Sequence, residues 1–351
     1  MPHKTVTSLD VAKHAGVSRA TVSFVLNNVP NIQISPETVQ RVLNSAKELG
    51  YEPNEMARAL VSRRSHSFAL ILSRSSDRIS SDMFLNLVVV GLLNVAHQNK
   101  MRLIIDVIED YDEKGIFMSL IKGKRVDGII LNGPRFDDKA LDYLLENKFP
   151  TVVMGHFPNP NFCSVDVDNV KAARMAVEHL TRLGYQRIAC ITNAPASFMA
   201  TLDRLEGYKQ ALAASNLPFS EDMVRYGNFG PESGYTQMLS LIDDPHFKMP
   251  AAVFIASDVV AFGAIRAIHE RGLKIPQDIA IVGFDDVPMS SYITPPLTTV
   301  RLPAMELADR AGALLLNQIQ NKQENPCQEL LDTELVIRQS CGSKSTTGVT
   351  R

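Results

Sequence analysis

Seven short apolar runs alternate with helix-length amphipathic segments over most of the chain, and this alternation constrains the fold more than any other feature. The runs lie at residues 68–72, 103–107, 128–131, 151–154, 187–191, 251–255 and 279–284. Between them lie segments such as residues 170–183, which end at Gly184, and residues 259–271, which end at Gly272. Strands that are apolar on both faces are typical of parallel sheets covered by helices. Two doubly wound parallel-sheet units fit the 351 residues better than one.

The N-terminal residues predict a small all-α head instead. A helical pattern at residues 9–15 runs into Gly16, and the chain restarts at Ser18, whose hydroxyl can cap a second helix. Helix, glycine-containing turn and second helix form the helix-turn-helix arrangement, whose second helix enters the DNA major groove. The residues that fit a shared core at helical spacing are Val11, Ala12, Ala15, Val17, Val22, Val25 and Leu26.

Two further helices are expected after this motif. Ser35 and Pro36 open a third helix with a cap and a proline at its first position, and Gly50 is placed to end it. Asn54 can cap one more short helix, which is too small to be stable alone in water. The polar, basic residues 61–67 then form the expected linker to the body.

The head carries a string of motifs in one order and at consistent spacing. They are Asp10-Val11-Ala12, Ala15-Gly16-Val17-Ser18, Thr21-Val22-Ser23, Val25-Leu26-Asn27, Leu49-Gly50-Tyr51, Pro53-Asn54 and Ala57-Arg58-Ala59-Leu60. The body adds Ala256-Ser257-Asp258, Gly263-Ala264, Ile275-Pro276, Val282-Gly283-Phe284-Asp285-Asp286 and Pro295-Pro296-Leu297-Thr298-Thr299-Val300. With these motifs the chain resembles the lactose/galactose-repressor family of bacterial transcription regulators, over essentially all of residues 5–340.

The resemblance implies a body like that of the periplasmic sugar-binding proteins, with two lobes that sandwich a ligand at the carboxyl ends of their strands. It implies chain crossovers between the lobes near residues 164–168, 291–295 and 321–327. The expected domains are a helix-turn-helix DNA-binding domain (1–53), a hinge helix and linker (54–66), an effector-binding and dimerisation domain (67–341), and a disordered tail (342–351).

The residues after the turn are expected to choose the operator. Arg19 can read guanine through O6 and N7 or hold a phosphate, and Ala20 can touch a thymine methyl. Phe24 offers apolar contact or simply packs. The remaining polar residues of this helix are assigned to phosphate contacts and helix geometry: Ser18, Thr21, Ser23 and Asn27.

The resemblance also implies a DNA-binding role for the hinge helix. In a dimer, the paired hinge helices lie in the minor groove and each inserts Leu60 as an apolar wedge, with Asn54, Ala57 and Arg58 in register. The hinge helix is expected to fold only on DNA, so that movement of the lobes switches it. Whether the effector induces or co-represses is left open.

Polar candidates for the effector site follow apolar strands. Arg204 matches the family's cleft arginine and can donate paired hydrogen bonds, although a salt bridge with Asp203 or Glu206 is the alternative. Asp285 follows a strand and can accept from sugar hydroxyls, or it orders a loop. Ser257 and Asp258 end the preceding strand, and for Asp258 a helix cap and a ligand contact remain equally open.

Aromatic candidates are Phe84 and Phe229, with Phe198 a weaker one, because an apolar ring face packs against sugar C–H groups. Core packing is the alternative for each. One departure from the family pattern is Gly155-His156, where many sugar-responsive members carry an aspartate. His156 either supplies a polar contact or is satisfied locally, so a non-sugar effector, such as a purine or a phosphorylated metabolite, stays open.

Composition and charge narrow the class further. Residues 1–65 carry eight basic and five acidic side chains, a formal charge of +3 against −2 for the whole chain, which suits phosphate contacts at one end. No apolar run reaches membrane-spanning length and Met1–Thr5 lacks the apolar core of a signal peptide, so a cytoplasmic location without membrane contact is expected. Scattered cysteines without C-x-x-C spacing indicate reduced thiols: Cys163, Cys190, Cys327 and Cys341.

An enzyme is the competing class. The nucleotide-binding, nucleophile-elbow and zinc-protease motifs are absent, and Leu273 stands where His269-Glu270 would need a second histidine. Asp166 and Asp168 alternate along an extended segment and are either paired catalytic acids or structural strand-end acids. We therefore expect no catalytic residue, metal or cofactor. The prediction is a ligand-responsive repressor that binds a pseudo-palindromic operator as a homodimer, with a small sugar as effector.

Overall fold

The computed structural model describes residues 6–27, 32–51, 64–73, 79–108, 113–135, 141–245, 251–320 and 326–343. Its contacts divide the chain into two compact units, Met1–His66 and Ser67–Arg351, called here the head and the body. Four of the predicted DNA-binding residues lie outside the described residues: Asn54, Ala57, Arg58 and Leu60. Residues 344–351 of the predicted tail lie outside them as well.

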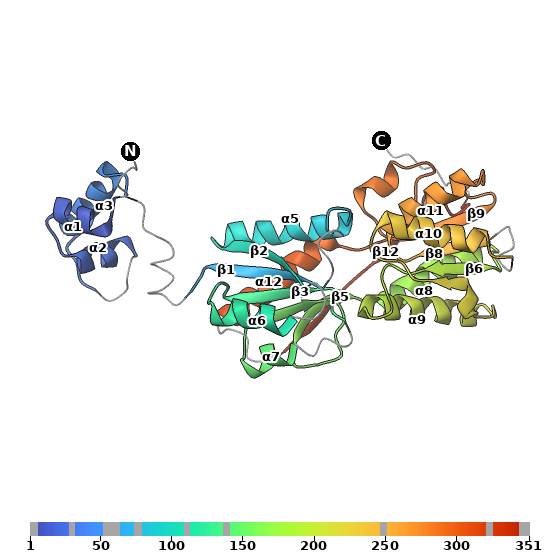
Figure 1. Cartoon of the computed structure of the whole chain (residues 1–351), viewed down its shortest axis with the longest axis horizontal. Helices are drawn as coiled ribbons and strands as arrows, with labels where there is room; N and C mark the ends of the chain where they lie inside the picture. Colours follow the sequence, from blue (N-terminus) through green and yellow to red (C-terminus); the bar gives the residue numbers. More distant parts are fainter. Residues whose placement is uncertain are drawn as a thin grey trace. The chain divides into compact units, whose positions relative to one another are not determined.

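Three helices form the described head: α1 (Ser8–Ala15), α2 (Arg19–Leu26) and α3 (Pro36–Glu48) (Figure 1). Gly16 ends α1 with a φ of 64°, a left-handed conformation that glycine adopts without strain. The Ser18 hydroxyl accepts the Thr21 N–H at 3.0 Å, and Ser35 accepts the Thr38 N–H at 3.3 Å. Val11, Ala15, Val22, Val42 and Ala46 are buried together, so the predicted core of the head is confirmed.

The first lobe of the body is built on a parallel sheet with the strand order β11-β5-β4-β3-β1-β2. Its strands are β1 (Ser67–Leu72), β2 (Arg102–Val107), β3 (Gly128–Asn132), β4 (Thr151–Met154), β5 (Cys163–Val167) and β11 (Gln328–Leu331). Its helices are α5 (Met83–Gln98), α6 (Glu113–Lys122), α7 (Leu141–Glu146) and α12 (Ala304–Ile319).

The second lobe has the strand order β12-β10-β9-β8-β6-β7, with β12 antiparallel to β10 and the other pairs parallel. Its strands are β6 (Ile188–Ile191), β7 (Val224–Arg225), β8 (Ala251–Ile255), β9 (Ile279–Asp285), β10 (Thr298–Arg301) and β12 (Glu334–Val336). Its helices are α8 (Asn169–Arg182), α9 (Met199–Ala214), α10 (Pro231–Ile242) and α11 (Asp258–Glu270), with short 3-10 turns η2 (Glu221–Met223) and η3 (Pro288–Ser291).

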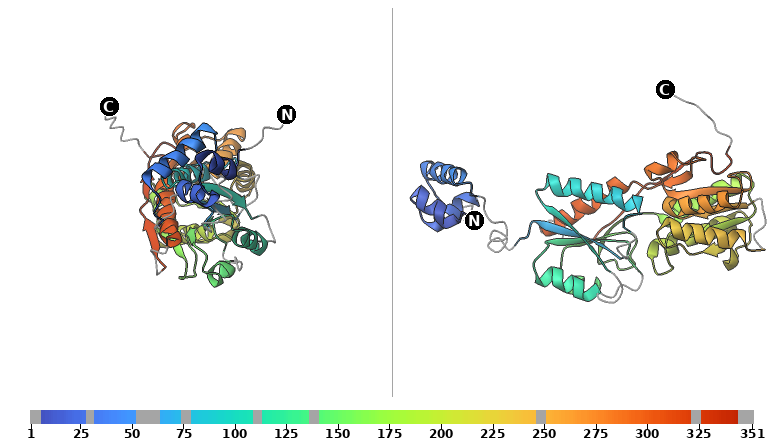
Figure 2. Two further views of the ribbon diagram at one scale, coloured as in Figure 1. Left: turned by 90° about the vertical axis from the view of Figure 1, so that its left-hand side faces the viewer. Right: turned by 45° about the horizontal axis from the view of Figure 1, so that its top comes forward.

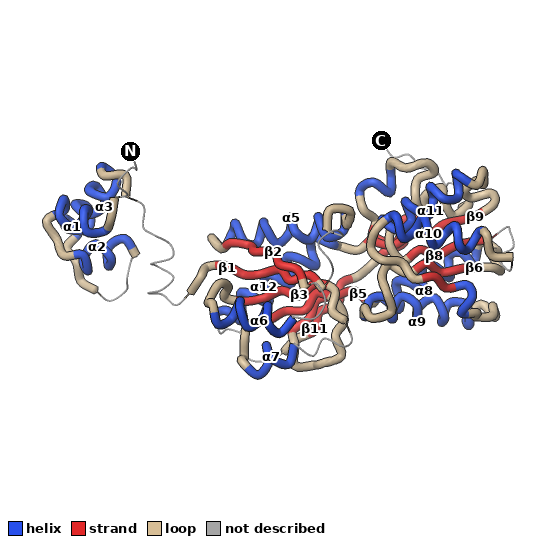
Figure 3. The backbone as a smooth tube through the Cα atoms, in the orientation of Figure 1, coloured by secondary structure: helices blue, strands red, loops and turns tan. Residues whose placement is uncertain are grey.

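Helices cover both faces of each sheet, as Figures 2 and 3 show. In the first lobe, Phe68, Leu70 and Leu72 of β1 face α5 and α12, whereas Ala69 and Ile71 face the side of α6 and α7. In the second lobe, α8 and α9 cover one face and α10 and α11 the other. The predicted architecture, parallel sheets buried on both sides, is therefore confirmed.

Two of the three predicted crossovers are wrong. The first crossing follows β5 at Asp168, within the predicted range. The second follows β10, at residues 302–303 rather than 291–295, because β10 pairs with β9 and α12 packs on the first lobe. The third lies at residues 332–333 rather than 321–327, because β11 still pairs with β5 and only β12 returns to the second sheet. Residues 292–295 instead form a loop that follows η3 within the second lobe, and just after this loop the Leu297 N–H donates to the Ser290 carbonyl at 2.8 Å.

None of the helices in the described part of the chain has both the length and the apolar character required to cross a bilayer.

Candidate functional site

Helix α2 presents a polar and largely exposed N-terminal turn. Arg19 and Ala20 are exposed, and Phe24 is half-buried. The Arg19 Nε donates to Ser8 Oγ at 2.9 Å, which orients its side chain along the start of α1. Asn27 Nδ2 donates to Ser23 Oγ at 3.1 Å, and the Ser18 and Thr21 hydroxyls lie 2.9 Å apart. The first turn of α2 is therefore held by local hydrogen bonds, with Arg19 and Ala20 open to a partner.

A cavity lies between the two lobes of the body, at the carboxyl ends of several strands. Part of its empty space of about 830 Å³ is open to solvent. Six of the seven residues predicted to contact an effector line it: Phe84, His156, Arg204, Phe229, Ser257 and Asp285. The weaker candidate Phe198 lines it too.

Arg204, in α9, is a buried cation in the lining of the cavity. Its guanidinium is buried, donates to Asn169 Oδ1 at 2.9 Å and to the Ala256 carbonyl at 2.7 Å, and lies 3.9 Å from the centre of the Phe284 ring. Burial lowers the pKa of Arg204, and the facing Asp285 opposes that shift. The predicted alternative, a surface salt bridge with Asp203 or Glu206, does not describe this buried position. Fixed in this way, the guanidinium presents its remaining N–H groups in one orientation.

Asp285 ends β9 with its Oδ1 3.8 Å from Arg204 Nη1. Burial raises the pKa of Asp285 well above its ordinary value, while Arg204 and a hydrogen bond from Ser257 act in the other direction. Its φ of 118° is unusual for a residue with a side chain, and such strain concentrates at binding sites. A carboxyl group held here can exchange hydrogen bonds with hydroxyl groups of a ligand.

The aromatic side chains come from both lobes. Phe198 and Phe229 of the second lobe meet edge to face, with ring centres 4.9 Å apart and planes at 87°. Phe84 reaches the cavity from the first turn of α5, which Asp82 caps by accepting the Leu85 N–H at 2.9 Å. The cavity therefore combines an apolar aromatic wall with a central polar cluster, the arrangement expected around a ring that carries hydroxyl groups.

His156 reaches the other lobe. Its Nδ1 lies 3.1 Å from Asp203 Oδ2 in α9, although half of the His156 side chain is exposed. Burial raises the pKa of Asp203, and His156 is the largest influence that lowers it. The His156 imidazole, at the position where the family pattern departs, thus interacts with the carboxyl group of Asp203.

The sequence analysis did not assign several polar residues of the cavity to the effector site: Asp82, Asn132, Asp166, Asn169 and Asn193. Burial raises the pKa of Asp166 to about 6, and Asn169 Nδ2 donates to its Oδ2 at 3.0 Å. Asn132 ends β3, and Asn169 and Asn193 follow β5 and β6. Polar residues at such positions often serve only as caps. That position was the one available signal, and it applies equally to many residues outside the cavity.

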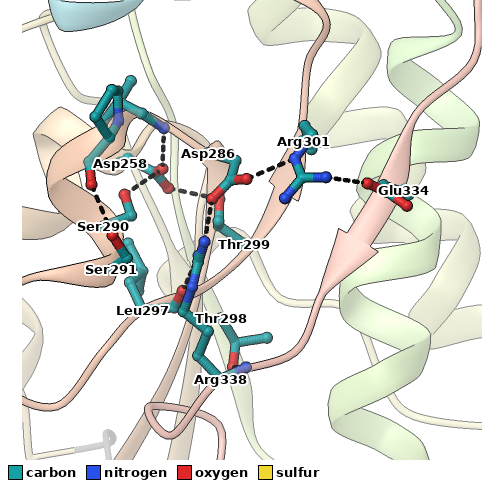
Figure 4. Close-up of polar contacts among 12 residues, drawn as sticks. Asp258, Asp286, Ser290, Ser291, Leu297, Thr298, Thr299, Arg301, Glu334 and Arg338 are labelled. Carbon is teal, nitrogen blue, oxygen red and sulfur yellow. Dashed lines mark hydrogen bonds and ion pairs between the residues drawn. The ribbon is translucent and has the colours of Figure 1, made fainter. Parts of the chain in front are cut away.

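Asp258 has neither of its two predicted roles, ligand contact and helix cap. It does not line the cavity, and it is not the N-cap residue of α11. Its carboxylate accepts from the Val287 N–H at 3.1 Å. It also accepts from the Ser290 and Thr299 hydroxyls at 2.6 Å each, as Figure 4 shows. It is fully buried, and burial raises its pKa to about 7. Ser257 is the N-cap residue of α11, so Asp258 is the first helical residue. Its role is to tie the loop after β9 to α11 and β10.

Asp286 organises the next layer of the same region (Figure 4). Its two oxygens accept from Arg301 Nε and Arg338 Nη2, each at 2.7 Å, and Arg301 also pairs with Glu334. Arg301 ends β10 and Glu334 begins β12, so this network joins the strand ends that flank the second and third crossovers.

A capped helix-turn-helix head joined to a two-lobed α/β body with a cavity between the lobes is the architecture of ligand-responsive transcription regulators. Two family models match the chain: bacterial regulatory proteins, lacI family, over residues 7–54, and a periplasmic binding protein-like domain over residues 177–341. The chain belongs to the lacI family.

Full-length relatives agree with this assignment. The HTH-type transcriptional regulator CelR of Thermobifida fusca is 33% identical, covering 94% of this chain and 96% of its own length. The HTH-type transcriptional repressor CytR of Escherichia coli (strain K12) is 35% identical, covering 95% and 96%. Among solved structures, the CelR–cellobiose complex matches with a TM-score of 0.73 at 32% identity, covering 95% of this chain and 99% of that chain. The lac repressor dimer bound to operator and the anti-inducer ONPF matches with a TM-score of 0.83 at 29% identity, covering 96% and 99%.

Proposed function

We propose that this regulator is a repressor whose operator affinity is set by a small, uncharged sugar bound between the lobes. The proposed effector binding rests on the cavity, whose lining combines Arg204 and Asp285 with the Phe198–Phe229 pair. CelR, whose solved complex holds cellobiose, supports a sugar as the ligand class.

The charge of the cavity argues for an uncharged ligand over a phosphorylated one. Asp82, Asp166 and Asp285 line the cavity together with Arg204, and all three carboxyl groups interact electrostatically with its guanidinium. Because Arg204 already interacts with Asn169, Ala256 and Asp285, a phosphate group would compete for it beside several carboxyl groups. Hydroxyl groups can both donate to the carboxyl groups and accept from the guanidinium, so they satisfy this lining without adding charge.

In the head, α2 and its two capping residues carry the first group of proposed operator contacts: Ser18, Arg19, Ala20, Thr21, Ser23, Phe24 and Asn27. The hinge adds a second group: Asn54, Ala57, Arg58 and Leu60. Support for the first group comes from the exposed first turn of α2, and for the second from the family motif in the sequence. Since one recognition helix covers one half-site, a pseudo-palindromic operator needs two copies of the chain.

A binding function without turnover fits the two aspartates that could have been paired acids. The Asp168 carboxylate caps α8 by accepting the Lys171 N–H at 2.9 Å, whereas Asp166 accepts from Asn169. The two carboxyl groups therefore serve different local structures. We propose that a bound effector is released unchanged, and mass spectrometry after prolonged incubation tests this directly.

Operator binding is tested by selecting duplexes from a random library with the full chain and measuring affinity by fluorescence anisotropy. Arg19→Ala is expected to weaken binding about tenfold and to relax the base preference at one position of each half-site. Lys47→Ala, which removes an exposed charge at the end of α3, is the matched control and should change affinity much less. Failure to enrich a palindromic sequence would contradict the proposal.

Effector binding is tested by thermal shift against pairs of related compounds: cellobiose and glucose, glucose and glucose 6-phosphate, adenosine and adenosine monophosphate. A ligand at about 100 times its dissociation constant adds roughly 2.7 kcal/mol to the folded state, enough to raise the melting temperature visibly. Uncharged sugars should shift the midpoint and phosphates should not. Arg204→Lys keeps the charge but loses the fork, so it should reduce the shift.

A further inference from the structure

The two lobes touch directly on one side of the effector cavity, and this contact is made of side-chain and backbone hydrogen bonds. The side-chain contact joins His156, which follows β4 of the first lobe, to Asp203 in α9 of the second. The backbone contact joins the segment after β3 to the start of α9: Arg135 and Phe198 form an antiparallel bridge, and the Met199 N–H donates to the Pro134 carbonyl at 3.3 Å.

Both contacts border the ligand space itself. Pro134, His156 and Phe198 line the cavity, and Asp203 precedes Arg204 in the same helix. A hydrogen bond that spans two lobes exists only when they are close together, so its free energy belongs to the closed form alone. The contact also has a specific chemical basis, because Asp203 is largely buried and His156 is the strongest of the influences that favour its charged form.

We propose that His156 and Asp203 form a cross-lobe latch that, together with the pairing of residues 134–135 with 198–199, holds the effector cavity closed. His156 then acts as a positioning residue through Asp203 and the lobe that carries Arg204. In the frame of the proposed function, on which this consequence rests, the latch raises affinity for any effector that binds the closed form. It also accounts for the histidine at position 156, because an aspartate there would face Asp203 as a second carboxylate.

The test needs neither an effector nor DNA, so it is independent of the proposed function. Hydrogen–deuterium exchange of the full chain, read by mass spectrometry, reports the peptide that contains the Met199 amide, whose acceptor lies in the other lobe. His156→Ala and Asp203→Asn should each speed exchange of that amide roughly three- to tenfold, the range expected for loss of one hydrogen bond. Amides of β8 should keep their protection, because that strand lies inside one lobe.

Two further variants separate a latch from general destabilisation. His156→Gln retains a donor that can reach Asp203 and should restore most of the protection at Met199. Arg225→Gln breaks a pair of the same length, Arg225 to Asp244 at 3.1 Å, within the second lobe, and should leave Met199 unchanged. The latch would be overturned if His156→Ala left exchange at Met199 unchanged, or if Arg225→Gln sped that exchange as much as His156→Ala does. Either result would count even if operator and sugar binding are found as proposed.

Discussion

Asp166 shows how a single carboxyl group in the cavity links ligand binding to stability. Its folded-state pKa of about 6 lies above the ordinary value of 3.8, chiefly because of burial. Between these two values the folded chain holds a proton that the unfolded chain has released, so this residue makes folding less favourable as pH rises. At neutral pH, Asp166 therefore costs stability in the absence of a ligand that donates to it.

Asp166→Asn removes that buried charge and keeps an oxygen for Asn169 Nδ2. We expect the melting temperature at pH 7.5 to rise by about 2–4 °C for each kcal/mol gained. The gain should shrink as pH falls through 6 and become small near pH 4, where the wild-type group is protonated in the folded chain and about half protonated in the unfolded chain. Calorimetric scans between pH 4 and pH 8 measure this, and a gain that persists at pH 4 would assign the effect to packing.

The contrast between Asp258 and Asp285 shows where residue-level prediction from sequence ends. Both aspartates follow apolar strands, and both are buried. The side chain of Asp258 is enclosed by Ser290 and Thr299, which lie 32 and 41 residues away in sequence, whereas Asp285 faces Arg204. Periodicity indicates that a residue ends a strand, but the partners that decide between loop ordering and cavity lining come from distant segments.

Among the elements, α10 and α11 approach each other most closely at two glycines. A Cβ on Gly263 would lie 1.7 Å from the Pro231 carbonyl oxygen, and one on Gly234 would lie 1.8 Å from the Val260 carbonyl oxygen. These obstacles are backbone atoms, which cannot rotate away as a side chain can. The two helices therefore pack backbone to backbone on the sheet face formed by β6, β8 and β9.

Gly263→Ala should force these helices apart and cost about 3 kcal/mol, at the upper end of overpacking penalties. Gly272→Ala is the matched control, because Gly272 ends the same helix at a φ of 71° with nothing within 4 Å of its added Cβ. It should cost about 1 kcal/mol, from backbone strain alone. Differential scanning calorimetry compares the two variants, and equal losses would contradict the close approach.

Which elements could be predicted from sequence follows from how local their signals are. The head was predictable because Ser18, Ser35 and Gly16 mark helix ends within a few residues. The second and third crossovers were not, because β10, β11 and β12 are short and are defined by pairing with distant strands. Without those strands, the Pro295-Pro296 segment looked like a passage between lobes and is instead a loop of the second lobe.

At the scale of the whole molecule, three crossovers join the two lobes of the body. Asp286 connects the end of β9, beside Asp285, to Arg301, which lies next to the second crossover and pairs with Glu334 beside the third. A ligand that engages Asp285 therefore lies close to the segments that join the lobes. Reciprocity requires that whatever factor the effector applies to operator affinity, the operator applies to effector affinity.

Self-association is the other whole-molecule requirement, and the first lobe offers a surface for it. Val90 and Leu93 on α5 are 45% and 49% exposed, and Ile105 on the sheet's edge strand β2 is 44% exposed. Helix α5 and strand β2 are in contact, so these apolar side chains belong to neighbouring elements. Grouped apolar exposure of this kind marks interaction surfaces, and the lac repressor structure similar to this chain is a dimer on its operator.

Leu93→Asp is expected to convert the dimer into a monomer, because a charge placed in an apolar interface loses its hydration when the copies meet. Operator affinity should then fall at least tenfold, since each head would bind its half-site without the second head held nearby. Sedimentation velocity and fluorescence anisotropy measure the two effects. Leu183→Asp, at a leucine of 39% exposure at the end of α8, is the control and should change neither. If Leu93→Asp remained dimeric with full operator affinity, the interface would have to lie on another face of the body.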